Sequence, residues 1–175
     1  MATKVKGVGV GVNIVEKSVT YVSNTVIQLL FRIAHKRGLD PSYIQGNLDV
    51  IEKGLRTWLS EQKLRALLLQ VFVADKDDAL ENWETMFEYY ADPKEEVRKP
   101  PVQEIEKACE GLAKLPPGAT YRIFASLDPD ATEVDGWVPG TPKSLVAALE
   151  KVFEDWGFGQ VGAKVRYQGG NWGDA

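Results

Sequence analysis

The chain has 175 residues, a formal net charge of −4 and one cysteine, Cys109. This length suits a single domain, and no run approaches the ~18 consecutive apolar residues that a membrane-spanning helix needs. An acidic net charge disfavours a general nucleic-acid binder, and a lone cysteine excludes an intrachain disulfide. We therefore expect a soluble cytoplasmic domain that contacts neither a membrane nor nucleic acid directly.

The beginning of the chain alternates valine with glycine or polar residues between Lys4 and Val15. A period of two is typical of a β-strand, although Gly7, Gly9 and Gly11 weaken strand pairing. We expect an edge strand or a flexible arm here. The glycines superficially resemble a phosphate loop, but neither a lysine-serine pair nor a helix start follows them, which disfavours that site.

Three helices are predicted by apolar residues that recur at three- and four-residue spacing. They span residues 18–37, 47–59 and 100–112, and a single helical turn is expected at 42–45. Ser18 and Asn47 are candidate N-caps, and Gly38 supplies a left-handed stop after the first helix.

Four strands are predicted at residues 64–73, 80–90, 119–127 and 161–167. The first two lie on either side of the acidic turn Asp75–Asp78 and are expected to form a β-hairpin. The charged stretch Asp92–Lys99 precedes two prolines and is expected to be a solvated loop. Helices gathered on one face of a mainly antiparallel sheet are the natural packing of this order. We therefore predict a single α+β domain with three core helices on one face of the sheet.

The residue types that carry catalysis are few. His35 is the only histidine, and its place in a basic last helical turn favours a capping or surface role. Cys109 lies on the apolar face of its helix and is expected to be a buried structural thiol. The turn Asp75–Asp78 lacks the glycine and the distal glutamate of a calcium loop. We expect no catalytic residue, no metal ion and no cofactor.

The last third of the chain supplies hinge residues and tryptophans but few catalytic side chains. Trp137, Trp156 and Trp172 lie beside glycines there. They either pin the tail onto the domain or line a groove for a peptide, because large amphipathic rings give contact area at little entropic cost. Trp58 and Trp83 lie on apolar faces and are expected in the core.

Taken together, the ordered segments resemble a HORMA domain. The likeness is to the bacterial HORMA proteins encoded with cGAS-like nucleotidyltransferases in anti-phage (CBASS) signalling operons, and it spans residues 18–167. The segments that carry it are Ser18-Val19-Thr20-Tyr21-Val22, Gly38-Leu39-Asp40-Pro41, Thr57-Trp58-Leu59 with Leu64-Arg65, the hairpin after Leu64, and Glu133-Val134-Asp135-Gly136-Trp137.

This resemblance implies a binding protein without bond-making chemistry of its own. In the family, a C-terminal safety belt is open or closed, and the closed belt wraps a closure-motif peptide that adds to the sheet as a strand. The peptide-bound form activates the nucleotidyltransferase, and an AAA+ remodelling ATPase pulls on the N-terminal segment to reopen the domain. For this chain the resemblance implies an N-terminal arm at 1–15, a core at 16–133 and a safety belt at 134–175.

The resemblance also implies two sets of functional residues. The peptide would lie between the safety belt and the strand at 119–127, against Tyr121, Ile123, Ala125, Val134, Trp137, Val161, Val165, Tyr167 and Trp172. The ATPase would engage Lys4, Lys6, Val8 and Val10. Self-association is a further expectation, since the arm of one molecule is able to occupy the belt of another.

Two points stay open at this stage. Residues 143–156 follow Pro142 and have helical apolar spacing, whereas a closed belt is mostly extended; this helix is either inserted within the belt or marks an open, peptide-free arrangement. The alternative function is a small enzyme or nucleotide-binding domain that uses the tail carboxylates Asp128, Asp130 and Asp135 and the N-terminal glycines. A pocket of convergent ionisable residues would favour that alternative.

Overall fold

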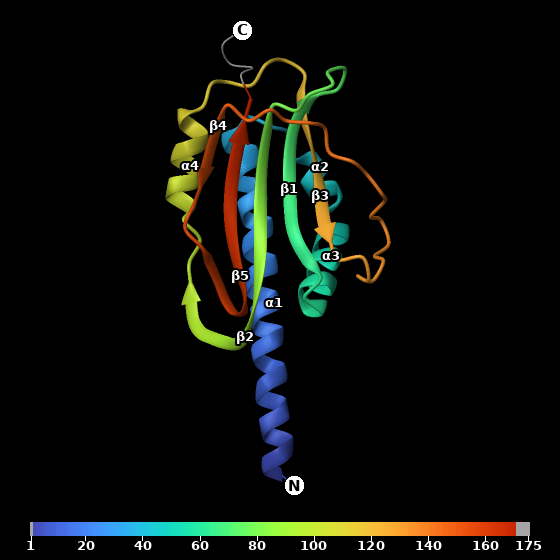
Figure 1. Ribbon diagram of the computed structural model, residues 1–175, viewed down its shortest axis with the longest axis vertical. Coiled ribbons are helices and arrows are strands. Elements are labelled where there is room, and N and C mark those ends of the chain that lie inside the picture. The colour runs from blue at the N-terminus through green and yellow to red at the C-terminus, as the bar shows by residue number, and fades with distance from the viewer. Residues whose placement is uncertain (1, 171–175) are drawn as a thin grey trace.

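The computed structural model describes residues 2–170, with side chains from residue 14 onward (Figure 1). Its helices and strands follow one another as α1 Ala2–Lys36, α2 Ser42–Gly46, α3 Leu48–Glu61, β1 Leu64–Val73, β2 Glu81–Arg98, α4 Val102–Gly111, β3 Ala119–Leu127, β4 Leu149–Val152 and β5 Trp156–Gly169.

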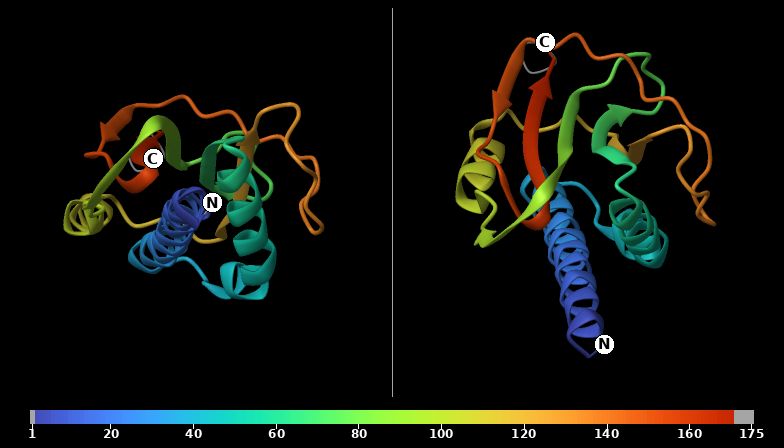
Figure 2. Two further views of the ribbon diagram at one scale, coloured as in Figure 1. Left: turned by 90° about the horizontal axis from the view of Figure 1, so that it is seen from below. Right: turned by 60° about the horizontal axis from the view of Figure 1, so that its bottom comes forward.

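The five strands form one antiparallel sheet in the order β3-β1-β2-β5-β4. Helices α1, α3 and α4 lie on the same face of this sheet, with α1 between the other two (Figure 2). The predicted α+β class with three helices on one face of a mainly antiparallel sheet is therefore confirmed. The opposite face is not covered by any helix among the described residues.

The core lies between α1 and the sheet. The predicted apolar stripe of the first helix is buried in full, from Val19 to Ile33. Gly38 adopts φ +70° and lets the chain turn after the last residue of α1. Trp58 and Trp83 are each 2% exposed, as expected for core residues.

The expected N-terminal strand is wrong, because residues from Ala2 onward continue α1. Ser18, predicted as an N-cap, lies inside this helix. Its hydroxyl donates a hydrogen bond to the carbonyl of Ile14 and accepts one from the amide of Gln160 in β5. Packing of this turn against β5 thus favours a continuous helix over the local strand pattern. Asn47 lies at the predicted N-cap position of α3, but its side chain makes no capping bond there, and its side-chain amide donates to the carbonyl of Tyr43 instead.

Two predictions about the second half of the chain are wrong because β5 pairs with a strand along each of its edges. The segment Asp92–Lys99, expected as a loop, is a strand as far as Arg98, because β2 continues through Lys94 and Arg98 and pairs with the first residues of β5. Residues 143–156 form no helix, because β4 pairs along the other edge of β5. The apolar residues of that expected helix are split, with Val146 and Leu149 82% and 60% exposed and Phe153 buried.

A buried ion pair, absent from the sequence-based predictions, joins the end of α1 to the start of β2. The guanidinium of Arg37 donates two hydrogen bonds to the carboxylate of Glu81, at 3.0 and 2.6 Å. Arg37 also bonds the carbonyls of Cys109 and Ala113. Tyr167 of β5 lies beside this pair, and burial together with the Glu81 charge raises the pKa of its hydroxyl.

Candidate functional site

Strand β3 is an edge of the sheet with a free side. It pairs with β1 from Leu64 to Val73, and within residues 2–170 no strand pairs with its other side. An unpaired edge presents a row of backbone amides and carbonyls that another strand is able to satisfy. The chain after β3 does not fill this place, because residues 128–142 leave the sheet as a wide loop (Figure 1).

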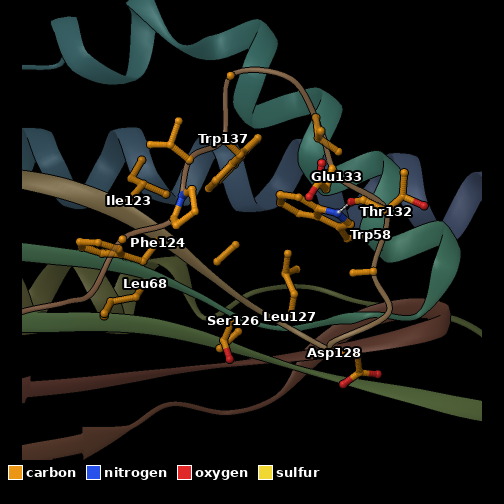
Figure 3. Close-up of a pocket in the computed structure, with 18 of the residues that line it drawn as sticks. Trp58, Leu68, Ile123, Phe124, Ser126, Leu127, Asp128, Thr132, Glu133 and Trp137 are labelled. Atoms are coloured by element: carbon orange, nitrogen blue, oxygen red, sulfur yellow. Dashed lines mark hydrogen bonds between the residues drawn. The ribbon is translucent and has the colours of Figure 1, made fainter.

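A pocket of about 830 Å³ lies between the β3 edge and the loop 128–142. Trp58 and Trp137 form one side of it, and Leu68 and Phe124 form the other (Figure 3). Ile123 and Phe124 are neighbours on β3 and point to opposite faces of the sheet, so the pocket straddles the strand edge. An added strand would therefore find an apolar wall on each of its own faces.

The tryptophan wall is fixed by hydrogen bonds to backbone carbonyls. The Nε1 of Trp137 donates to the carbonyl of Val50 at 2.8 Å, and the Nε1 of Trp58 donates to the carbonyl of Thr132 at 2.7 Å. The two rings meet edge to face with centroids 5.0 Å apart. Gly54 of α3 allows this approach, since a Cβ there would lie 2.5 Å from the Trp137 Nε1.

Both ends of the loop 128–142 are attached to the core. At its start, Asp128 accepts two hydrogen bonds from Arg65, at 2.7 and 2.6 Å, and Asp130 accepts one from Lys63 at 2.8 Å. Just past its end, the backbone of Lys143 exchanges hydrogen bonds with the side-chain amide of Gln70, at 2.7 and 3.0 Å. The loop is therefore attached at both ends, and its middle is held against α3 through Thr132 and Trp137.

Acidification is expected to release the start of this loop before the core unfolds. Hydrogen bonds from Arg65 and Lys63 lower the pKa of Asp128 and of Asp130 from the ordinary value of an aspartate, and bonds from Thr132 lower the pKa of Glu61 in the same way. A carboxyl whose pKa is lowered in the docked state favours docking above its ordinary pKa and loses that contribution as the pH falls.

NMR of backbone amides between pH 6 and about pH 2 would measure this release, because docking is lost as the pH falls through the lowered pKa of each carboxyl. Signals from residues 128–137 should change before those of β1. An Asp128→Asn/Asp130→Asn variant should show the released signals already at neutral pH. Simultaneous loss of all signals would mean that these carboxylates do not hold the loop separately.

The pocket lining is acidic. It contains Glu84, Asp128, Glu133 and Asp135 and no lysine, arginine or histidine. Glu84 pairs with Arg166 and Asp128 with Arg65, whereas Glu133 and Asp135 make no ion pair with the described residues. The rim formed by residues 133–135 therefore carries uncompensated negative charge.

The structure brings together part of the predicted peptide site. Ile123, Ala125, Val134 and Trp137 all line the pocket. Tyr121 does not, because its ring is buried against α2 and its hydroxyl donates to the carbonyl of Asp40 at 2.6 Å. Sequence reasoning missed Phe124, Leu68 and the prolines of the loop, since alternation along β3 placed Phe124 on the other face.

The remaining predicted residues lie elsewhere. Val161, Val165 and Tyr167 are buried in β5, which β1 and β2 separate from β3. They hold β5 on the sheet and do not reach the pocket. Trp172 lies outside the described residues. Lys4, Lys6, Val8 and Val10 belong to the first turns of α1.

The described residues offer little to catalysis. His35 is exposed, and Cys109 is 1% exposed with burial raising the pKa of its thiol to about 12. Asp128 and Asp130 are engaged in ion pairs at the start of the loop. No group of three or more metal-binding side chains occurs in the part of the chain that the structure describes. No helix within that part is long and apolar enough to cross a membrane.

Comparison with known proteins identifies the fold. A chain of the mitotic checkpoint complex superposes with a TM-score of 0.77 at 17% identity, over 87% of this chain and 98% of that one. The C. elegans protein HTP-2, bound to the HIM-3 closure motif, gives 0.70 at 13% identity, over 89% and 91%. The E. coli MS115-1 CdnC:HORMA-deltaN complex gives 0.60 at 13% identity, over 89% and 90%.

At these identities the structural likeness shows the fold alone. No curated protein matches the chain. The sequence model of the family described as Bacterial HORMA domain 2, however, matches residues 8–154, which is most of the chain. The chain therefore belongs to the bacterial HORMA domain 2 family.

Proposed function

We propose that this protein is a peptide-binding conformational switch whose safety belt is closed in the structure described above. The single observation that carries this proposal is the unpaired β3 edge enclosed by the loop 128–142. A peptide in the pocket would extend the sheet, so that backbone hydrogen bonds give affinity and the apolar walls select side chains. The protein acts by binding and not by catalysis.

The path of the tail supports the closed assignment. After the loop 128–142, the chain passes the turn between β1 and β2, where the amide of Ala79 donates to the carbonyl of Ser144 at 2.8 Å. It then forms β4 and β5 at the far edge of the sheet, on β2 (Figure 1). A strand held against β3 would thus be enclosed by a segment attached to the core on both sides.

The partners of this switch are part of the same proposal. The E. coli relative is in a complex with CdnC, and C. elegans HTP-2 is bound to a closure motif. We infer that the peptide-bound form of this chain binds and activates a cGAS-like nucleotidyltransferase in anti-phage defence. An AAA+ ATPase would reopen it by pulling on the first turns of α1, which extend beyond the sheet (Figure 1).

A peptide-library pull-down with the full chain tests the proposal, followed by hydrogen exchange with the best binder. Protection is expected in β3 and in the loop 128–142, because the peptide would pair with the first and be covered by the second. A scrambled peptide of the same composition is the control. Failure of every library peptide, or protection confined to other elements, would overturn the assignment of the pocket.

A further inference from the structure

We propose that the pocket also accepts the N-terminal segment of a second copy of this chain, so that residues 4–12 of one molecule add as a strand to β3 of another. The proposal rests on the function proposed above, since it uses the same edge and the same loop. The charge of this segment, the alternation of its side chains and its position all fit the site.

The charge of the N-terminal segment is complementary to that of the pocket rim. The pocket rim carries Glu133 and Asp135 without a cationic partner among the described residues, and no basic side chain lines the pocket. The N-terminal segment carries Lys4 and Lys6 and has no acidic residue before Glu16. A basic strand is therefore the complementary ligand, and opposite charges favour its approach.

The alternation of side chains in the N-terminal segment suits a strand at the β3 edge. In an extended chain, even-numbered residues share one face, so Lys4 and Lys6 lie on the same side as Val8, Val10 and Val12. A strand antiparallel to β3 would place the lysines near Leu127 and the rim, and the valines along Ala125 and Ile123. The other face is mostly glycine, which allows close approach of the loop.

Converting the N-terminal segment from a helix to a strand costs little free energy. Glycine is about 1 kcal/mol less favourable than alanine in a helix, whereas valine is enriched in strands. The first turns of α1 extend beyond the strands, and no other element lies beside them in Figure 1 or in the right panel of Figure 2. The helix at residues 4–12 is therefore built from residues of low helix propensity, so its conversion to a strand costs little free energy.

The attachment of α1 to β5 favours an N-terminal segment from a second molecule. Residues 14–18 are attached to β5, where the Ser18 hydroxyl accepts a bond from Gln160. The strands β1 and β2 lie between β5 and β3. A strand from another molecule reaches the pocket without crossing the sheet of its own domain. Reciprocal exchange would give a closed dimer, and one-way insertion would give longer chains.

Light scattering over a range of concentrations tests this inference with the full chain. The mass should rise above that of a monomer as the concentration increases. Lys4→Glu/Lys6→Glu should weaken self-association about ten-fold, and so should Glu133→Lys/Asp135→Lys, because each converts attraction into repulsion at the rim. An equimolar mixture of the two variants should regain association, since the swapped charges are again complementary.

A Lys17→Glu/Lys53→Glu variant is the matched control, because it changes the net charge equally at two exposed lysines outside the contact. It should associate like the unchanged chain. A monomer at every concentration, association that neither swap affects, or a mixture that stays monomeric would overturn the inference. If a library peptide still occupies the pocket in that case, the proposed function stands; if none does, both fail.

Discussion

Replacing Glu81 by glutamine is expected to lower the free energy of unfolding by about 3–5 kcal/mol, because the change leaves a buried guanidinium without its countercharge. The side chains of Arg37 and Glu81 are only 3% and 0% exposed. Chemical denaturation at neutral pH would measure the loss. The rings of Trp83 and Tyr167 of β5 have centroids 4.6 Å apart, and Trp83 also donates a hydrogen bond to Glu81, so the attachment of β5 should be loosened as well.

A control on the same strand separates this effect from the general cost of removing a charge. Glu84 pairs with Arg166 at 2.6 Å, but the two side chains are 24% and 32% exposed. Glu84→Gln should therefore cost less than about 1 kcal/mol. An Arg37→Met/Glu81→Leu variant should recover most of the stability lost in Glu81→Gln, because it removes both charges. Equal losses for Glu81→Gln and Glu84→Gln would contradict the prediction.

The sequence predicts those elements whose side chains have one clear apolar face. The stripe of α1, the hairpin of β1 and β2, and the strand β3 all follow the expected periodicity. Gly38 ends α1 as predicted, because a left-handed residue is the usual stop. Of the nine residues that the family resemblance implies for the peptide site, four line one pocket: Ile123, Ala125, Val134 and Trp137.

The errors arise where a distant part of the chain decides the local structure. The segment 143–156 has helical spacing, yet pairing of β4 with β5 satisfies its backbone in an extended form. Gly157 and Gly159 extend the pairing of β5 with β2 well beyond the predicted strand. The buried pair of Arg37 and Glu81 joins residues 44 apart in sequence, and no local pattern announces it.

Replacing Gly54 by alanine is expected to reduce peptide affinity at least ten-fold without raising stability. In an ordinary helix this change would stabilise the fold by up to ~1 kcal/mol. Here the new Cβ would lie 2.5 Å from the Trp137 Nε1 and 2.8 Å from the ring of Trp58. Trp137 must then leave Val50, and the apolar wall of the pocket moves with it. Titration of the best library peptide, alongside denaturation, would measure both effects.

Gly111→Ala is the matched control, because Gly111 ends α4 and a Cβ there would meet nothing within 4 Å. It should leave the peptide affinity unchanged, and the free energy of unfolding should stay the same or rise slightly. A Gly54→Ala protein that binds peptide normally would show that the tryptophan wall does not shape the site. Loss of binding together with cooperative unfolding would instead show that the close packing of α3 against Trp137 places the wall against which the peptide binds.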